Sequence, residues 1–322
     1  MYPLISAIIP TYNYARYLNE AIQSIIQQDY PKDKIEIIVV DDGSTDNTKE
    51  VLQQQIQDDI IQYHYQPNQG KAAATVKAIK MATGKYIFNL DADDYFLPNK
   101  IKRTVEVFES DDAIVHIGTP AQILNQDENI AKSTEGLPAE ILEVKTEGLS
   151  LLQFFYQNNI LYGGGSTFSA RASVLKKIDI PAEVDMYIDE FLILAVLPFG
   201  KSFFIQQPLS IWRVHNSNYS GKVEAPAKQS EKARRLLKSS SSVLTYLVQN
   251  NFDEMLIKIY TLKHKTREIA NKETEKTKSL KDIFQYTKDV FFEVKPGWTI
   301  IKKYHVLNRL LPMPVYRFLK KI

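Results

Sequence analysis

Short apolar runs alternate with helix-period segments through the first part of the chain. The runs read as buried strands and cover residues 4–9, 35–40, 60–66 and 86–90. Strands that alternate with helices of this length indicate parallel βαβ units, in which the carboxyl ends of the strands share one edge of the sheet. We therefore predict a Rossmann-like α/β fold, with a mostly parallel central sheet flanked by helices.

Three carboxylates stand where the fourth of these strands ends. Asp91, Asp93 and Asp94 follow the run 86–90, at the sheet edge where α/β proteins bind ligands. Carboxylates this close repel one another and are costly to desolvate unless a cation or hydrogen-bond donors neutralise them. Oxygen ligands with no Cys or His nearby suit Mg²⁺ or Mn²⁺, which shares its remaining positions with water and a substrate phosphate. The alternative is a solvated acidic turn that caps the next helix.

Two further polar loops are expected at the same edge. Residues 10–13 follow the first strand, and Asp41 and Asp42 end the second. Because these strands are predicted to be parallel, both loops should converge with the three carboxylates. The second loop also has the composition of a turn followed by a helix cap, formed by Ser44 or Asp46, and this role is compatible with ligand binding.

The two parts of the chain differ in charge. Residues 1–221 carry 18 Lys and Arg against 28 Asp and Glu, a net charge of −10, whereas residues 222–322 carry 22 against 10, a net charge of +12. We predict an α/β domain over 1–221 and a helical, basic region over 222–322. The chain has no cysteine, so a thiolate metal site is excluded. It has no apolar run of spanning length, and we expect a soluble or peripheral protein.

The stretch 295–322 combines cations with aromatic rings. It has seven Lys or Arg and no acid, interleaved with Trp298, Tyr304, Tyr316 and Phe318. Helices over about 299–311 and 314–322 would offer apolar stripes flanked by cations, which fits an anchor on an anionic membrane surface. Helices packed on their own domain or on a partner are the alternative. No recognised nucleic-acid-reading motif is present, and no nucleic acid partner is expected.

Four segments, taken in order, carry a family resemblance. They read IIPTYNYARYLNEAIQSIIQQDY, IEIIVVDDGSTDNT, PNQGKAAATVKAIKMATGKYIFNLDADDYFLP and, later, DE followed by WRVH. Together they resemble the inverting glycosyltransferases of family 2, which have the GT-A fold, over residues 3–220. The resemblance implies transfer of a sugar from a nucleotide-diphosphate sugar, with a UDP-sugar as the expected donor, to a hydroxyl of a saccharide or lipid-linked acceptor. It implies Mn²⁺ or Mg²⁺ as cofactor and a cytoplasmic setting in surface polysaccharide or glycolipid synthesis, on the inner face of the membrane if the tail is an anchor.

The resemblance also implies which residues bind the donor. The loop that holds the nucleoside is matched by Pro10, Thr11, Tyr12 and Asn13, and the carboxylate that hydrogen-bonds the base or ribose is matched by Asp42 or Asp41. The DxD motif is matched by Asp91, Ala92 and Asp93. Asp93 is the expected metal ligand, with Asp91 and Asp94 as further candidates, and Asp91 would face the donor ribose or sugar. Lys71 either faces the donor or is an ordinary lysine on a helix surface.

The later motifs imply the reacting groups. An inverting transfer needs a general base that takes the acceptor proton, and Glu190 is the first choice, with Asp189 in reserve. The alternative for this pair is a helix N-terminal acid pair stabilised by the macrodipole. Arg213 and His215 would neutralise leaving-group charge, or else make a structural hydrogen bond at a strand end.

Other function classes fit the motifs less well. A nucleotidyltransferase would share the fold class and the metal, but the first loop lacks a Gly-rich, basic phosphate-binding pattern. A nicotinamide enzyme is excluded because no G-x-G-x-x-G follows the first strand. A non-catalytic nucleotide-sugar-binding or scaffolding protein on the same fold stays open, although the intact acid cluster argues against it.

Overall fold

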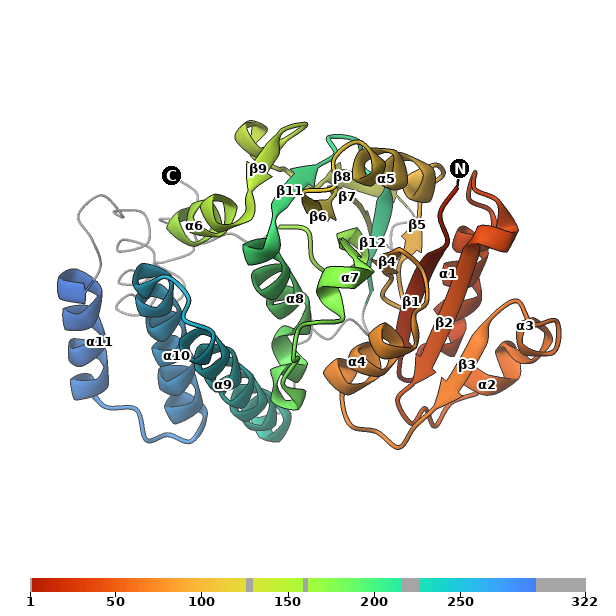
Figure 1. The fold of residues 1–322 in the computed structure, drawn as a ribbon. Helices are drawn as coiled ribbons and strands as arrows, with labels where there is room; N and C mark the ends of the chain where they lie inside the picture. Colours follow the sequence, from red (N-terminus) through yellow and green to blue (C-terminus); the bar gives the residue numbers. More distant parts are fainter. Residues whose placement is uncertain (1, 126–129, 159–161, 216–225, 294–322) are drawn as a thin grey trace. The chain divides into compact units, whose positions relative to one another are not determined.

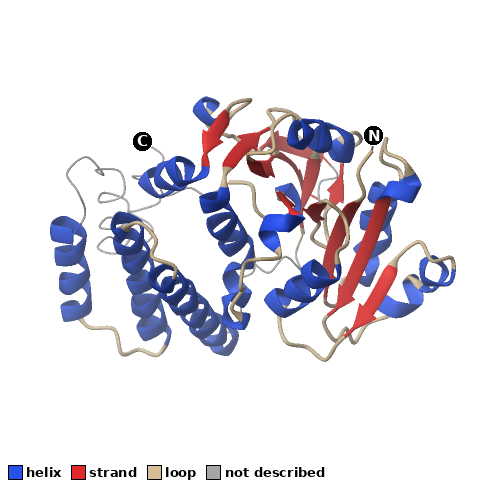
Figure 2. Ribbon diagram, in the orientation of Figure 1, coloured by secondary structure: helices blue, strands red, loops and turns tan. Residues whose placement is uncertain are grey.

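The computed structural model of the chain describes residues 2–125, 130–158, 162–215 and 226–293. It divides into two compact units: Met1–Leu152 with Tyr162–Lys222, and Gln153–Leu161 with Val223–Ile322. The division falls inside α6 (Gly148–Asn158). Figure 1 labels the elements along the chain, and Figure 2 distinguishes helices from strands. The boundary predicted between residues 221 and 222 stays a prediction.

An eight-stranded sheet forms the centre of the first unit (Figures 1 and 2). Its strands, in spatial order, are β3 (Gln62–Tyr65), β2 (Ile35–Asp41), β1 (Ile5–Thr11), β4 (Tyr86–Asn89), β10 (Ser169–Arg171), β6 (Ile114–Gly118), β11 (Lys201–Phe204) and β9 (Lys145–Glu147). The first four strands are parallel to one another, and β6 is parallel to β11. β10 and β9 are antiparallel to their neighbours. The predicted α/β class with a mostly parallel sheet is confirmed.

A second, four-stranded sheet connects the acid cluster to a distant part of the chain. Its order is β5 (Tyr95–Phe96), β12 (Ser210–Val214), β7 (Ala121–Asn125) and β8 (Ile130–Thr134). β5 follows the acid cluster directly and pairs with β12, so that Ser210 lies opposite Phe96. We expected a loop or small hairpin over 119–148, and the structure has the hairpin β7–β8 together with β9. The pairing of β5 with β12 places residues 210–214 beside the acid cluster.

The helices of the first unit follow the predicted order. They are α1 (Ala15–Ile26), α2 (Thr48–Val51), α3 (Gln53–Gln57), α4 (Lys71–Met81), α5 (Lys100–Glu109), α7 (Ala172–Leu175) and α8 (Ile188–Val196). α1 buries Leu18, Ile22 and Ile25 completely, at the spacing of one helix face. Two short helices, α2 and α3, follow β2, and the short α7 follows β10.

The loops after β1, β2 and β4 meet at one edge of the large sheet. Thr11 lies opposite Asp41 in the β1–β2 register, and the N–H of Asp42 donates to the Thr11 carbonyl at 2.9 Å. On the other side of β1, the N–H of Leu90 donates to the carbonyl of Ile8 at 3.0 Å. The parallel pairing therefore brings the three polar loops together as predicted.

Lys100 is a fully buried lysine at the start of α5. Its Nζ lies 5.1 Å from the centroid of the Phe96 ring and 3.5 Å from Thr119 Oγ1. Burial disfavours the charged ammonium and lowers the pKa of Lys100 to about 7. The amine is therefore partly neutral at physiological pH.

The second unit contains three long helices, α9 (Pro226–Gln249), α10 (Glu254–Thr274) and α11 (Leu280–Glu293). α10 packs against α9 and α11, and Asp253 caps it by accepting from the N–H groups of Met255 and Leu256. These helices lie in the range 222–322, which was predicted from the sequence to be helical. None of the helices in the described ranges is long and apolar enough to cross a membrane. The tail helices predicted over 299–311 and 314–322 lie outside the described residues.

Candidate active site

The loop after β1 is tied to the loop after β2. Asn13 has a positive φ of 59°, and its N–H donates to Ser44 Oγ at 2.9 Å. Its side-chain Oδ1 accepts from the N–H of Thr45 at 2.7 Å. Between the buried Thr11 and Asn13, Tyr12 is 44 % exposed. Its ring therefore stands at the sheet edge, where an aromatic plane can accept a flat ligand.

Asp41 and Asp42 bind groups of the protein itself. Asp42 is buried and accepts from Gln66 Nε2 at 2.8 Å and from the backbone N–H groups of Gln69 and Gly70 at 2.9 and 2.7 Å. Asp41 accepts from the N–H of Ser44 at 2.8 Å and from the Tyr63 hydroxyl. The two acids thus hold the turn after β2 and the loop that leads into α4.

Asp46, rather than Ser44, bonds the start of the next helix. The residue at the cap position of α2 is Asn47, which makes no side-chain capping bond. Asp46 accepts from the N–H of Thr48 at 3.1 Å, and its other oxygen accepts from the N–H of Ala15, at the start of α1, also at 3.1 Å. This one carboxylate therefore fixes the starts of two helices that follow neighbouring strands.

Lys71 connects two acids that are distant in sequence. Its Nζ lies 3.0 Å from Asp91 Oδ1 and 3.0 Å from Asp189 Oδ2. Burial alone would lower the pKa of Lys71, but the charges of Asp189 and Asp91 outweigh it, so the pKa is raised. The ammonium is therefore charged, and it joins the predicted DxD motif to the predicted acid pair. Lys71 is therefore not an ordinary lysine on a helix surface. Asp189 does more than lie in the first turn of a helix, because its carboxylate bonds Lys71.

Asp94 is also fixed by hydrogen bonds within the protein. Its Oδ2 accepts from Ser166 Oγ at 2.6 Å, and its Oδ1 accepts from the backbone N–H of Arg213 at 2.9 Å. Burial raises the pKa of Asp94 well above its usual value, and the neighbouring Asp93 raises it further. Ser166 Oγ also accepts from the N–H of Asp91 at 3.1 Å. Asp94 thereby fastens β12 and the segment around Ser166 to the acid cluster.

Asp93 faces a histidine. Its Oδ2 lies 3.2 Å from His215 Nε2. Burial raises the pKa of Asp93 to about 6, and the nearby charge of Asp91 contributes in the same direction. His215 stacks on Tyr17 with ring centroids 4.6 Å apart, and Arg16 Nη2 lies 3.5 Å from its Nδ1. The imidazole is thus held in a fixed position. The carboxylate beside it has a raised pKa, so a bound proton or a nearby cation would stabilise it.

Arg213 turns its side chain toward α1. Its guanidinium donates to Glu20 Oε2 at 2.7 Å and lies over the rings of Tyr17 and Tyr95, 4.8 and 5.3 Å from their centroids. Of the two basic residues predicted on this segment, His215 contacts the acid cluster with its side chain, whereas Arg213 contacts it through its backbone N–H. The sequence held no signal for Glu20 or for Ser166, because each acts through a partner far along the chain.

Asp189 is the member of the Asp189–Glu190 pair that bonds Lys71. It is the second residue of α8, and burial raises its pKa, although the charge of Lys71 opposes this effect. The backbone of Gly164 passes so close that a Cβ there would lie 3.2 Å from Asp189 Cβ. At Gly165, where φ is +51°, a Cβ would lie 3.1 Å from Asp91 Oδ2. The sequence left open whether residues 163–167 let an acceptor approach the backbone or form a flexible turn. In the structure, Gly164 and Gly165 allow the backbone to pass beside both acids.

The fit of this site to a divalent cation rests on Asp93 and His215. Within the described ranges, no group of three or more His, Cys, Asp or Glu side chains is arranged to hold a metal ion. Lys71 bonds Asp91 Oδ1, and protein donors bond both oxygens of Asp94. Asp93 offers carboxylate oxygens, the kind of ligand that suits Mn²⁺ or Mg²⁺, and the imidazole nitrogen of His215 lies beside it; such an ion would take its remaining ligands from water and a diphosphate.

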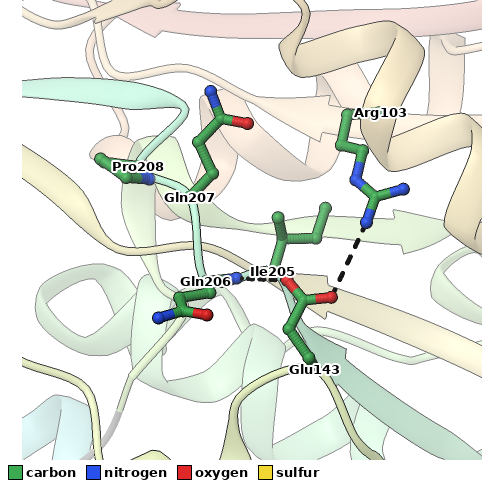
Figure 3. A pocket seen from close by; sticks show the side chains of 6 residues that line it. All are labelled: Arg103, Glu143, Ile205, Gln206, Gln207 and Pro208. Atoms are coloured by element: carbon green, nitrogen blue, oxygen red, sulfur yellow. Dashed lines mark hydrogen bonds and ion pairs between the residues drawn. The ribbon is translucent and has the colours of Figure 1, made fainter.

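A separate hollow of about 520 Å³ lies away from these residues (Figure 3). It is lined by Arg103, Glu143, Ile205, Gln206, Gln207 and Pro208. Glu143 lies at its rim, where it accepts from the N–H of Gln206 at 2.7 Å and lies 3.7 Å from Arg103 Nη2. None of the predicted site residues lines this hollow, so it is distinct from the site at the sheet edge.

Sequence comparison places the chain among known proteins. The family model described as Glycosyl transferase family 2 matches residues 6–179. An uncharacterized glycosyltransferase of Nostoc sp. is 34 % identical over 238 residues, which is 71 % of this chain and 71 % of that protein. TuaG of Bacillus subtilis, whose name refers to teichuronic acid biosynthesis, is 38 % identical over 106 residues, which is 32 % of this chain and 41 % of that protein.

Solved structures share the fold at low sequence identity. Staphylococcus aureus TarS (residues 1–349), crystallised with UDP-GlcNAc, aligns with a TM-score of 0.62 and 18 % identity over 89 % of this chain and 79 % of that one. The mannosyltransferase PcManGT of Pyrobaculum calidifontis, in complex with GDP-Man and Mn²⁺, aligns with a TM-score of 0.54 and 15 % identity over 96 % and 86 %. Both are glycosyltransferase folds of the kind that the order of motifs predicted.

Proposed function

The chain belongs to glycosyl transferase family 2 and is a glycosyltransferase, and from this we propose that it transfers a sugar from a nucleotide-diphosphate sugar to an acceptor hydroxyl with inversion. The contact of Lys71 with both Asp91 and Asp189 is the observation that carries the proposal. It joins the acid motif that follows β4 to the acid pair that begins α8. One site in the first unit would thereby contain both the proposed donor-binding motif and the proposed base.

Asp189 is our candidate for the general base. The sequence favoured Glu190, but Asp189 is the residue that bonds Lys71 at 3.0 Å. Its carboxylate would accept the proton of the acceptor hydroxyl while the hydroxyl oxygen forms a bond to the anomeric carbon. The bond from that carbon to the diphosphate oxygen breaks, and its electron pair leaves with the diphosphate. A raised pKa makes the carboxylate of Asp189 a stronger base than an ordinary aspartate.

Asp93 and His215 are our candidates for holding a divalent cation. Such an ion supplies positive charge for the departing diphosphate, and PcManGT carries Mn²⁺ in its structure. Asp91, separated from Asp93 by Ala92, would face the ribose or sugar of the donor. Lys71 keeps Asp91 and Asp189 in place and contributes a further positive charge beside the leaving group.

The loops after β1 and β2 are our candidates for the nucleoside site. The exposed ring of Tyr12 would lie against the base, and Asn13 with Asp41 and Asp42 would keep both loops in shape. Residues 10 and 11 would contribute through their backbone. A UDP-sugar is the first donor to test and a GDP-sugar the second, because TarS and PcManGT were crystallised with such donors.

The acceptor is proposed to be a growing saccharide or a lipid-linked sugar. The name of TuaG, which refers to a cell-surface polymer, supports a place in surface polysaccharide synthesis. Such acceptors are assembled at the cytoplasmic face of a membrane, which is the setting we propose. Attachment through residues 295–322 belongs to the same proposal and rests on their sequence alone, with seven cations and no acid.

Calorimetric titration tests the donor site. UDP, GDP, CDP and dTDP would each be titrated, with and without Mn²⁺, into the wild type and into Asp93→Asn. We expect one diphosphate to bind in a metal-dependent way, and Asp93→Asn to lose that binding. Asp33→Asn, which changes an acid whose side chain is 75 % exposed, is the matched control and should bind like the wild type.

Two outcomes would contradict the proposal. If a folded sample binds none of the four diphosphates, the donor site is wrong. If one diphosphate binds but is never released from its nucleotide sugar, in water or with saccharide acceptors, the chain is a binding protein on a glycosyltransferase fold.

A further inference from the structure

The outer face of α11 carries two large apolar side chains in contact with solvent. Leu280 is 85 % exposed and Phe284 is 72 % exposed. They lie four residues apart and therefore on one side of the helix, one turn from each other. Single exposed apolar residues are common, but a neighbouring pair at this exposure marks a surface that has a partner.

Two lysines flank this pair. Lys281 and Lys288 are exposed as well. At about 100° of rotation per residue, they fall with Leu280 and Phe284 in an arc of about 100° of the helix circumference. These four side chains define what we call the outer face of α11.

Asp282 and Asp289 of α11 point to a different side. Asp282 is bonded by Lys272, and Asp289 by Lys265, and both lysines belong to α10. Tyr286, also on this inner side, is buried. α11 therefore uses Asp282 and Asp289 for packing on α10, and its outer face combines apolar groups with positive charge.

We propose that the outer face of α11 binds the surface of an anionic lipid bilayer. Leu280 and Phe284 would enter the boundary between headgroups and acyl chains, while Lys281 and Lys288 would contact lipid phosphates. Charge complementarity supports this partner, because residues 222–294, without the tail, carry 15 Lys and Arg against 10 Asp and Glu, a net charge of +5. A nucleic acid would satisfy the lysines but leave the two apolar side chains in water.

This surface is separate from the glycosyltransferase site and from the tail. The four residues lie in a described helix, whereas the sequence-based proposal for membrane attachment concerns residues 295–322. The outer face can be altered in the full-length chain while the tail and the acid cluster stay intact. Failure of one proposal therefore does not decide the other.

Vesicle sedimentation of the full-length protein tests the proposal. The vesicles would be made of phosphatidylcholine alone or of phosphatidylcholine mixed with phosphatidylglycerol. We expect binding to the mixed vesicles, and a fall in the partition coefficient of about tenfold or more in the double variant Leu280→Ser, Phe284→Ser. The double variant Lys281→Gln, Lys288→Gln should lose roughly fivefold per lysine on mixed vesicles and change little on neutral ones.

Matched controls use exposed residues elsewhere. Val248→Ser alters an apolar side chain of α9 that is 54 % exposed, and Lys49→Gln with Lys80→Gln removes two exposed lysines of the first unit. Both control variants should partition like the wild type. Because all these side chains are exposed, the circular dichroism spectrum and the melting temperature should not change.

Three results would overturn the proposal. The first is wild-type partitioning by the Leu280→Ser, Phe284→Ser variant, which would leave membrane binding to other residues. The second is equal binding of the wild type to neutral and anionic vesicles. The third is a wild-type dimer in light scattering that this variant converts to a monomer without a change in vesicle binding, which would make the outer face a contact between two copies of the chain.

Discussion

Two sets of aspartates follow parallel strands of the large sheet, β2 and β4, which lie on either side of β1, and their surroundings differ. After β2, Asp41 and Asp42 accept hydrogen bonds from backbone N–H groups, an amide and a hydroxyl. After β4, burial raises the pKa of Asp93 and Asp94. Similar sequence patterns at the same sheet edge thus give carboxylates in different electrostatic environments. The difference is clearest between Asp42, which accepts three hydrogen bonds, and Asp93, whose pKa is raised by burial and by the charge of Asp91.

Substitution of Asp189 should have the largest effect on activity. Asp189→Asn keeps the size of the side chain but removes the proton acceptor, so we expect turnover to fall by about 10²–10⁴-fold. Release of nucleoside diphosphate in the presence of acceptor measures this. Nucleotide affinity should stay near that of the wild type.

Glu190→Gln is the matched control for this substitution. It changes the neighbouring acid of α8 in the same way and should retain most of the activity. If Glu190→Gln is the inactive variant and Asp189→Asn is active, the base is the residue that the sequence favoured.

The contrast between the two acid sets predicts stability changes of opposite sign. Asp42→Asn places an amide group among three donors, so we expect a loss of about 3 kcal/mol in the free energy of unfolding. Asp93→Asn removes a carboxylate with a pKa of about 6 and should stabilise the chain at pH 8, by up to about 3 kcal/mol. Urea denaturation of both variants measures these changes.

The direction of the pKa shift of Asp93 fixes how its contribution to stability changes with pH. Its folded pKa lies above its unfolded pKa, so the folded state binds more protons and wild-type stability falls as the pH rises from about 4 to 6. Asp93→Asn should remove this part of the fall, and its advantage should vanish below about pH 4. If both variants lose stability equally at pH 8, the two acid sets do not differ as described.

Lys71→Met sharpens the comparison within the acid cluster. The charge of Lys71 opposes the rise in the pKa of Asp189, so its removal should move the acidic limb of the kcat/KM profile to higher pH. We expect a loss of about tenfold in kcat near neutral pH, since Asp91 and Asp189 lose the group that joins them. Lys71→Arg, which keeps the charge, should restore the profile. A loss of activity with an unshifted profile would make the role of Lys71 purely structural.

The smallest effect should come from Tyr63, which bonds Asp41. Tyr63→Phe removes one hydroxyl donor at 2.6 Å, and we expect a loss of about 1 kcal/mol in stability with little change in turnover. Tyr65→Phe, at a ring that is 58 % exposed, is the control and should be neutral. A large loss of turnover in Tyr63→Phe would show that Asp41 takes part in catalysis.

Local signals in the sequence were sufficient for much of the fold. Apolar runs located β1, β2 and β4, and α4 begins and ends at the predicted residues 71 and 81. A strand was expected near residue 168, but the antiparallel pairing of β10 and the β5–β12 pairing were not predicted. Those pairings join residues more than 80 positions apart, and no local periodicity reports them.

The residues of the candidate site were named from the sequence, but the hydrogen bonds and ion pairs between them were not predicted. Asp91, Asp93, Asp189 and His215 were all named from the sequence, and the structure brings them together. The sequence does not show which carboxylate bonds Lys71 or in which direction the side chain of Arg213 points. Both depend on side-chain geometry in the folded chain. Ser166 and Glu20 were missed because each owes its role to a partner that only the tertiary structure brings close.

Folding changes the protonation state of Lys100. At pH 8 the unfolded lysine is charged, whereas the buried amine, with a pKa of about 7, is mostly neutral. Unfolding should therefore take up close to one proton from the buffer at this residue. The heat of unfolding measured in a scanning calorimeter will then depend on the ionisation enthalpy of the buffer, and Lys100→Met should reduce that dependence.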